Sequence, residues 1–324
     1  MDETGAAIAA AVRTPAWIRN ACRDVIKACR RILGPEHEPM SLPVRIIRRI
    51  FGNYLLVTAD GKPFVVDLRD AVVSYGILAD DIWERETTTL FKMLLRPGDV
   101  AIDVGANIGY FSVLFALLVG SSGRVLAFEP DEASLRLLQE NCKLNGVENV
   151  VATVRAAAGA RESVAVLHGS TASSVSNRGG HRIAHHAPAT GPADTSVRVV
   201  DVDAYARAFA SVSAIKVDVE GYEAQALAGM GGLLDRVPGV ALVMEFWPRA
   251  IRENGDDPHA FLDRLAGRGL SFWRIGGSHL VRAVLAGDLL QELPGDNDQA
   301  DLLCMRPDEF RRRLPALGEQ CAPC

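Results

Sequence analysis

Short apolar segments rich in β-branched residues alternate with longer helical patterns through the middle of the chain. The short segments cover Asp99–Val104, Arg124–Pro130, Val150–Gly159, Ser213–Gly221 and Gly239–Pro248. A helical pattern follows most of them, as in Glu132–Gly146. This alternation indicates βαβ units. It predicts an α/β fold with a mostly parallel sheet and helices on both faces.

The segment before this alternation has a different pattern. Two β-rich runs flank Asp60-Gly61 within Asn53–Leu68, which predicts a β-hairpin. From Val73 the pattern is helical, and it ends at "RPGD". We therefore expect residues 41–98 to form a hairpin and helix that pack on the core, and residues 99–282 to form the main domain.

Three segments fall outside these patterns. Residues 1–40 contain a basic amphipathic helix at Ala6–Leu33 and a linker. The helix could contact an anionic membrane surface or a partner, or it could pack by one face and leave its charges in solvent. Residues 161–200 are rich in Ser, Gly, Ala and His, and we expect them to form a long loop. Residues 283–324 are expected to form a C-terminal extension.

The composition of the chain argues against some classes of function but does not indicate an activity. The chain has 48% hydrophobic residues and a formal net charge of −5, so general attraction to nucleic acid is not expected. Six cysteines in 324 residues do not indicate a disulfide framework, and the terminal "CAPC" is either a frayed tail or a weak metal or redox candidate. No transmembrane stretch or signal-peptide pattern is visible, so a cytoplasmic protein is expected.

The candidate chemistry begins in "AIDVGANIGYFS", where a predicted strand meets a predicted helix. Gly105 can adopt the backbone angles of a tight turn and lets a ligand approach closely. The following helix N-terminus favours an anion such as a carboxylate. In an open parallel sheet, ligands bind at this end of the strands.

The second strand ends at Glu129, at the distance from Gly105 where an acid recognises ribose hydroxyls. The nicotinamide fingerprint has a glycine at the position of Asn107, where it makes room for a pyrophosphate. Asn107 would crowd a pyrophosphate but could bind an amino acid, so the pattern favours S-adenosylmethionine. A nicotinamide-dependent oxidoreductase and a non-catalytic module that retains the fold are the alternatives.

Several motifs together resemble one family. They include "WERETTTLFKMLLRPGDVAIDVGANIGYFS", "VLAFEPDEASLRLLQENCKLNGVENV", "IKVDVEGYEAQALAG" and "ALVMEFWP". In order and spacing the chain is similar to the FkbM-type S-adenosylmethionine-dependent methyltransferases over about residues 54–248. The resemblance implies a Rossmann-like class I methyltransferase fold and O-methylation of a sugar or natural-product hydroxyl.

The resemblance also implies which residues hold the cofactor. The methionine end would contact Asp103, Gly105, Ala106 and Asn107. Glu129 would hold the ribose and Pro130 follows it. Ala156 and Ala157 would lie beside the adenine, and Glu84 near the cofactor.

Methyl transfer to a hydroxyl requires an aligned acceptor and a group that takes its proton. Lys216, Asp218 and Glu220 alternate at the end of the fourth strand, so they would share one face if the strand continued that far. Asp218 is the first candidate for the base or for orienting the acceptor, and Lys216 could tune it. Alternatively, a Lys–Asp pair only fixes the strand end, and Glu220 caps the helix that begins near Tyr222.

Other polar and aromatic residues are weaker candidates. Glu245 could face the same cleft, with Trp247 and Tyr110 as walls. His181, His185 and His186 are candidates for a base, and less so for metal ligands, while Ser173 and Ser174 suggest that the loop contacts substrate. We expect no metal, no nucleic acid partner and a small-molecule or glycan acceptor. The "DVEG" segment also lacks the N/D-P-P-Y/F-like pattern of enzymes that methylate nucleic-acid bases.

Overall fold

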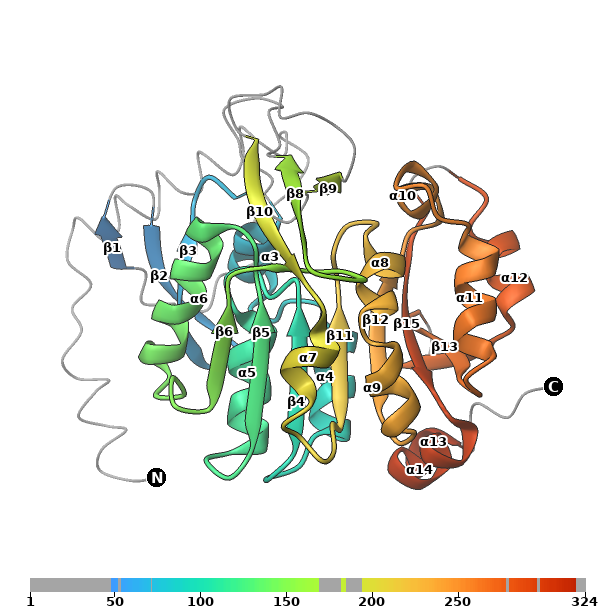
Figure 1. Ribbon diagram of the computed structural model, residues 1–324. Coiled ribbons are helices and arrows are strands. Elements are labelled where there is room, and N and C mark those ends of the chain that lie inside the picture. Colours follow the sequence, from blue (N-terminus) through green and yellow to red (C-terminus); the bar gives the residue numbers. More distant parts are fainter. Residues whose placement is uncertain are drawn as a thin grey trace, which may run out of the picture.

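The structure is a computed structural model (Figure 1). It describes residues 48–51, 54–70, 72–168, 182–184, 194–277, 280–295 and 298–318. The predicted helix at residues 6–33, the three loop histidines, Ser173, Ser174 and the terminal cysteines lie outside the described residues.

The central element is an eight-stranded sheet in the order β14-β13-β15-β12-β11-β4-β5-β6. Its strands are β4 (Val100–Val104), β5 (Arg124–Phe128), β6 (Val151–Val154), β11 (Ala214–Val217), β12 (Ala241–Phe246), β13 (Ser271–Ile275), β14 (Val281–Val284) and β15 (Ala300–Met305). The five strands from β12 to β6 pair in parallel, and β15 is antiparallel to both of its neighbours. This mostly parallel arrangement confirms the predicted Rossmann-like α/β fold.

Successive residues of each strand enter separate cores on the two faces, because side chains alternate across a sheet. Ala101 and Val125 pack on the face covered by α4 (Arg85–Leu94), α5 (Tyr110–Val119) and α6 (Glu132–Leu144). Ile102 and Leu126 pack on the opposite face, which α8 (Glu223–Ala228), α9 (Gly231–Arg236) and α11 (Pro258–Ala266) cover. The sheet is therefore buried on both sides, as the apolar strand sequences require.

The predicted hairpin is present and belongs to a three-stranded sheet of β1 (Arg48–Phe51), β2 (Tyr54–Ala59) and β3 (Lys62–Asp67). Asp60 and Gly61 both have positive φ, as a tight hairpin turn requires. Asn141 on α6 accepts a hydrogen bond from the Val65 N–H (2.7 Å) and donates to the Val65 carbonyl (3.2 Å). These bonds join the small sheet to the main domain, and α3 (Val73–Asp80) follows it.

The predicted long loop at residues 161–200 is wrong in part, because its two ends form strands. β8 (Ser163–His168) and β10 (Thr195–Val200) pair antiparallel, and β10 pairs in parallel with β7 (Ala157–Ala158). With β9 (Arg182–Ala184) they form a four-stranded sheet above the main one (Figure 1). Alternate side chains such as Leu167 and Val197 form its core, a periodicity that the surrounding polar residues obscured.

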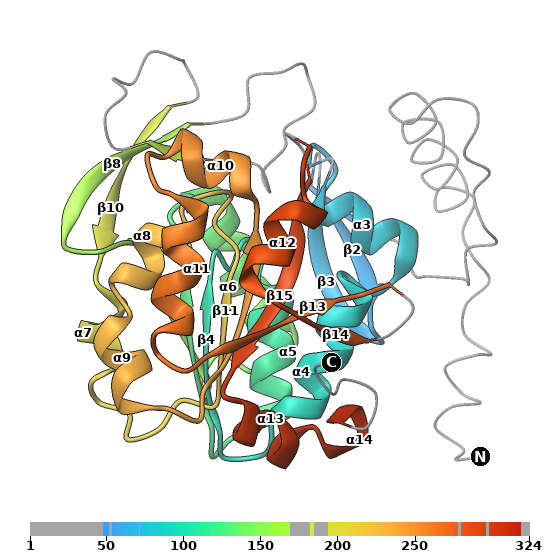
Figure 2. The same ribbon diagram turned by 90° about the vertical axis from the view of Figure 1, so that its right-hand side faces the viewer.

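The described residues after 282, which end at residue 318, are part of the main domain rather than a C-terminal extension. That boundary falls inside β14, and β15 inserts between β12 and β13. Figure 2 shows α12 (Ala286–Glu292) beside α11 on this side, with α13 (Pro307–Arg313) and α14 (Pro315–Gly318) below. Arg313 donates to the carbonyls of Ser213, Gly239 and Leu94, and so joins three elements.

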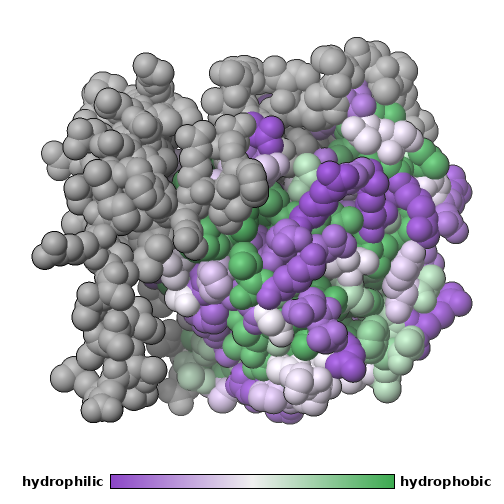
Figure 3. Space-filling model, turned by 90° about the vertical axis from the view of Figure 1, so that its left-hand side faces the viewer, coloured by the Kyte–Doolittle hydropathy of each residue, from purple (hydrophilic) through white to green (hydrophobic). Residues whose placement is uncertain are grey.

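Two short helices complete the fold, α7 (Val202–Ala206) and α10 (Pro248–Glu253). Hydrophilic and hydrophobic residues are intermixed on the described surface in Figure 3. The exposed large hydrophobic residues are scattered over different elements: Leu117, Leu144, Val164 and Leu285. Within the described part of the chain, no helix combines the length and apolar character needed to cross a bilayer.

Candidate active site

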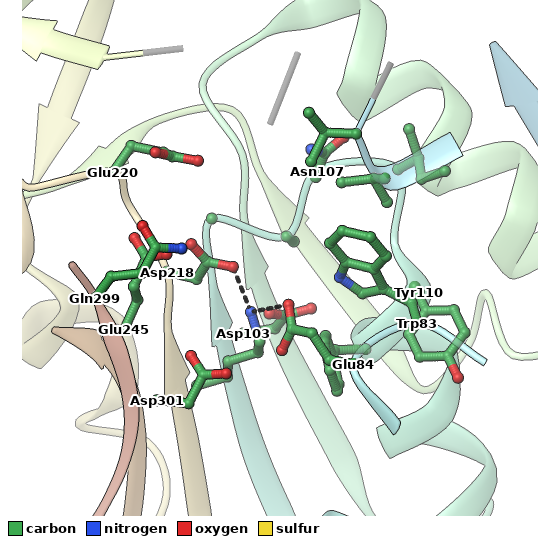
Figure 4. A pocket seen from close by; sticks show the side chains of 17 residues that line it. Trp83, Glu84, Asp103, Asn107, Tyr110, Asp218, Glu220, Glu245, Gln299 and Asp301 are labelled. Carbon is green, nitrogen blue, oxygen red and sulfur yellow. Dashed lines mark hydrogen bonds and ion pairs between the residues drawn. The ribbon is translucent and has the colours of Figure 1, made fainter. Parts of the chain in front are cut away.

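The chain changes direction across the sheet after β4, because β5 and β6 extend to one side of it and β11 to the other. The carboxyl ends of β4 and β11 therefore flank a crevice, which is where open α/β sheets bind ligands. A cavity of about 280 Å³ lies there and reaches the ends of β12 and β15 (Figure 4). A second cavity of about 50 Å³ adjoins it toward β5 and β7.

The loop after β4 is shaped by close backbone contact. Gly105 has φ +82°, and a Cβ built on it would lie 1.8 Å from the Asp218 carbonyl oxygen. Only glycine fits this position without moving one of the two chains. Asn107 also has positive φ, and its buried Oδ1 has no hydrogen-bond partner. An unpaired buried amide oxygen is costly unless a ligand donates to it.

Asp103 lies below this loop at the end of β4 and is buried. The Ser112 hydroxyl of α5 donates to Asp103 Oδ2 (2.6 Å). Burial raises the pKa of Asp103 to about 6, against the opposing effects of Lys216 and Ser112. Ala106, the next predicted contact, lines the same cavity as Asp103.

Glu129 follows β5 and turns its carboxylate toward the loop. It accepts from the Asn107 N–H and the Asp131 N–H, each at 2.8 Å. Burial raises the pKa of Glu129 to about 8. With Pro130 and Ala157 it lines the smaller cavity, whose walls include the apolar side chains of Leu167 and Ile183.

Gly105, Asn107, Asp218 and Glu220 line both cavities. The two cavities therefore form one site with a junction at these residues. An acid at one end, flat apolar walls of alanine beside it, a tight glycine turn and an unpaired Asn107 oxygen fit a nucleoside joined to an amino acid. All the predicted cofactor residues, including Glu84, line one or both cavities.

Lys216 is the buried centre of an ionic group. Its Nζ lies 2.7 Å from Asp218 Oδ2 and 3.8 Å from Glu84 Oε1, the pairs joined by dashed lines in Figure 4. It also lies 4.6 Å from the centre of the Phe111 ring. Burial disfavours the ammonium, but Asp218, Glu84 and Asp103 together raise the pKa of Lys216 above its ordinary value. Lys216 is therefore a fixed cation that holds Asp218 in place.

Glu84 reaches this group from the segment before α4, where it has φ +42°. Burial raises the pKa of Glu84 to about 8, although Lys216 opposes the shift. Non-glycine residues seldom adopt the left-handed backbone conformation, and holding one there costs on the order of 1–3 kcal/mol of folding free energy. The structure thus accepts local strain at the residue that brings this carboxylate into the cavity.

Glu220 does not continue the face of Lys216 and Asp218, because β11 ends at Val217 and Glu220 has φ +55°. The capping role of Glu220 stays a prediction. Glu223, in the first turn of α8, accepts from the N–H groups of Val219 and Gly221, at 3.2 and 3.1 Å. Sequence reasoning missed Glu223, although a glutamate in the first helical turn is a recognised signal for such bonds. Glu220 lines both cavities from this turn.

Glu245 ends β12 and faces the larger cavity, as the sequence suggested (Figure 4). Its Oε2 is buried without a hydrogen-bond partner. Burial, followed by repulsion from Asp218 and Glu220, raises the pKa of Glu245 to about 10. Asp301 stands opposite it in the antiparallel pair of β12 and β15, and burial raises the pKa of Asp301 to about 6.

Asp301, Gln299 and Trp83 were not predicted to belong to the site. Gln299 precedes β15, and Asp301 lies near its start. Because β15 follows β13 and β14 in sequence, no local signal placed these two residues at the site. Trp83 and Tyr110 form an aromatic wall opposite the carboxylates of β11, β12 and β15 (Figure 4). Trp247 does not line either cavity. Among the residues described, no group of three or more His, Cys, Asp or Glu side chains is arranged to hold a metal ion.

Comparison with known proteins gives one family match. The family model described as "Methyltransferase FkbM domain" matches residues 103–271, just over half of the chain. A probable cobalt-precorrin-6B C(15)-methyltransferase (decarboxylating) of Pyrobaculum calidifontis is 40% identical over 72 residues, which are 22% of this chain and 37% of the relative. Its counterpart in Saccharolobus solfataricus is 32% identical over 72 residues, 22% of this chain and 36% of the relative.

The chain thus spans little more than a third of the length of these curated relatives. Among solved structures, it is similar to precorrin-6y C5,15-methyltransferase from Geobacter metallireducens. The TM-score is 0.37 at 13% identity, and the match covers 69% of this chain and 87% of the other.

Proposed function

Because the chain belongs to the FkbM family of S-adenosylmethionine-dependent methyltransferases, we propose that it methylates a hydroxyl group of a sugar or a related natural product. Family membership agrees with the resemblance seen in the sequence, and it leaves the oxidoreductase alternative without support. The acceptor is the part of the proposal that rests on the site itself.

The cofactor would span the two cavities. Glu129 would accept the ribose hydroxyls beside Pro130 and Ala157, and the amino-acid part would reach Asn107 and Asp103 in the larger cavity. When bound, S-adenosylmethionine supplies an electrophilic methyl group on a positively charged sulfur. The carboxyl groups that surround the larger cavity would favour a ligand of that charge, because a bound cation shifts them toward their ionised form.

The observation that carries the proposal is the contrast between the two walls of the larger cavity. Trp83 and Tyr110 offer apolar faces on one side, and Asp218, Glu245 and Asp301 offer carboxyl oxygens on the other (Figure 4). A sugar or other cyclic alcohol presents the complementary pattern. The faces of its ring are apolar, and the hydroxyl groups at the edge of the ring donate hydrogen bonds.

Asp218 is suited to orienting the acceptor. Its Oδ2 is bonded to Lys216, which is buried and fixed, so the carboxylate holds one position at the junction of the cavities. Its side chain is 29% exposed, which leaves it accessible from the cavity. A hydroxyl that donates to this carboxylate would be held in place, and such alignment contributes on the order of 7–11 kcal/mol to bimolecular reactions.

Two measurements test the proposal in order. Calorimetric titration should show that S-adenosylmethionine binds and NAD does not. Transfer of labelled methyl should then be measured on a panel of monosaccharides, glycosides and polyketide alcohols, with amines and RNA as controls. Label in an ether product supports the proposal. Transfer to nitrogen, carbon or RNA in place of hydroxyl oxygen would overturn it.

A further inference from the structure

Resting on the proposed function, we propose that Glu245 is the catalytic base, which takes the proton from the acceptor hydroxyl, while Asp218 orients that hydroxyl. The step balances as follows. The hydroxyl oxygen bonds to the methyl carbon as the carbon–sulfur bond breaks with its electron pair left on sulfur, and the hydroxyl proton passes to a Glu245 oxygen.

The carboxyl groups of Asp218 and Glu245 differ in their hydrogen-bond partners. Asp218 Oδ2 is bonded to Lys216 at 2.7 Å, so that oxygen is committed to an internal ion pair. Glu245 Oε2 is buried and has no partner. A buried acceptor of this kind is costly, and an acceptor hydroxyl that donates to it would remove the cost.

Glu245 and Asp218 lie close to the loop after β4 that would hold the cofactor. Glu245 lies at the carboxyl end of β12, and Asp218 follows the neighbouring strand β11, so both face the larger cavity from the same edge of the sheet (Figure 4). The cofactor loop supplies Gly105 and Asn107 to that cavity from β4, next to β11. A hydroxyl between the junction residues and β12 can therefore contact Asp218 on one side and Glu245 on the other.

The charge around Glu245 is mainly acidic. Carboxyl groups face Glu245 from several elements: Asp218 and Glu220 from the turn after β11, Glu223 from α8, and Asp301 from β15. Lys216 on β11, the cation of this group, is bonded to Asp218. Burial and repulsion raise the pKa of Glu245 to about 10, so this group holds a proton more firmly than an ordinary glutamate. A bound sulfonium would lower that pKa by favouring the carboxylate, and would prepare Glu245 to accept a proton.

An experiment without any acceptor tests this placement. Titrations of the full chain with S-adenosylmethionine and S-adenosylhomocysteine at pH 8, in buffers of different ionisation enthalpy, count the protons released on binding. The wild type should release up to about one more proton with the sulfonium than with the neutral thioether. Glu245→Gln should abolish this excess. Glu292→Gln, which removes a carboxylate paired with Arg274 and Arg282 away from the site, should preserve it.

Comparing variant with wild type cancels the protons that the ligands themselves gain or lose. If neither ligand binds to the wild type, it is the proposed function that fails. If both bind and Glu245→Gln leaves the proton excess unchanged, Glu245 does not face the sulfonium and the inference is overturned. The inference is also overturned if Glu84→Gln abolishes the excess of released protons and Glu245→Gln does not.

Turnover gives the second readout, with the acceptor identified by the labelled-methyl assay. Glu245→Gln should lower kcat about 10²–10⁴-fold and remove the rising limb of the pH–rate profile. Glu245→Asp keeps a carboxylate, so it should retain that limb at a lower rate. Unchanged affinity for S-adenosylhomocysteine checks that each variant is folded. A Glu245→Gln enzyme with wild-type kcat and pH profile would overturn the assignment of the base.

Discussion

Gly105 and the carbonyl oxygen of Asp218 lie so close that a Cβ at position 105 would come within 1.8 Å of that oxygen. The contact joins the loop that would hold the cofactor to the turn that would present the acceptor-orienting carboxylate. The two parts of the proposed site are thus held against each other through backbone atoms.

This contact predicts the effect of Gly105→Ala. The new methyl group must displace one of the two chains, so we expect loss of S-adenosylmethionine binding and destabilisation by roughly 3 kcal/mol or more. Gly61→Ala is the matched control, because Gly61 also has positive φ but nothing lies within 4 Å of its Cβ position. Urea unfolding and calorimetric titration of both variants measure the difference. Equal stability losses would show that backbone strain alone, and not the contact, makes position 105 a glycine.

Glu129→Ala should weaken cofactor binding strongly. The change removes the proposed ribose acceptor and also the acceptor of the Asn107 N–H. Leaving a buried donor without its acceptor costs about 1–3 kcal/mol, which corresponds to roughly 5- to 150-fold in Kd. Glu132→Ala, on the partly exposed first turn of α6, should leave Kd nearly unchanged. Calorimetric titration with S-adenosylmethionine measures Kd for both variants. An unchanged Kd for Glu129→Ala would show that Glu129 does not bind the ribose.

Asp218→Asn should separate binding from turnover. The side chain keeps its shape but loses the charge that pairs with Lys216, so the acceptor is held less well. We expect cofactor Kd to change little and kcat to fall on the order of 10²-fold, as misalignment typically does. The control is Asp235→Asn, which breaks an exposed ion pair with Arg268. Full activity of the Asp218 variant would place the orienting group elsewhere.

The raised pKa values predict how stability depends on pH in the absence of ligand. Glu245 has a pKa of about 10 when folded and an ordinary value of 4.5. Between those values the folded protein binds more protons than the unfolded chain, so stability falls as pH rises. The loss for one such group reaches about 1.4 kcal/mol per pH unit.

The test compares wild type with Glu245→Gln by urea unfolding at pH 6, 7, 8 and 9. The variant cannot ionise at this position, so its stability relative to wild type should increase with pH. A constant difference across this range would mean that the folded-state pKa of Glu245 is not raised.

Methyl transfer should survive treatment with EDTA. The proposed step uses Glu245, Asp218 and Lys216, and assigns no task to a metal ion. Activity should be measured after EDTA treatment and again after Mg²⁺ is added back. Loss by EDTA and recovery with Mg²⁺ would show that methyl transfer needs a divalent cation.

The sequence by itself determined the strands β4, β5, β11 and β12 and the glycine turn that follows β4. Their signals are local: apolar β-branched runs, a glycine turn at Gly105 and an acid at the end of β5. Lys216 and Asp218 could also be recognised, because ionisable residues at the end of an apolar strand stand out from their surroundings.

Only the tertiary structure decided which residues complete the larger cavity. Asp301 and Gln299 reach it because β15 inserts antiparallel beside β12, a pairing that connects residues far apart in sequence. The strands within residues 161–200 likewise form through contacts with one another and with β7. The sequence could not show that the Glu245 Oε2 atom lacks a hydrogen-bond partner. The pattern of a strand specifies the face of the sheet on which a side chain lies, but it does not specify which side chains from other elements lie beside it.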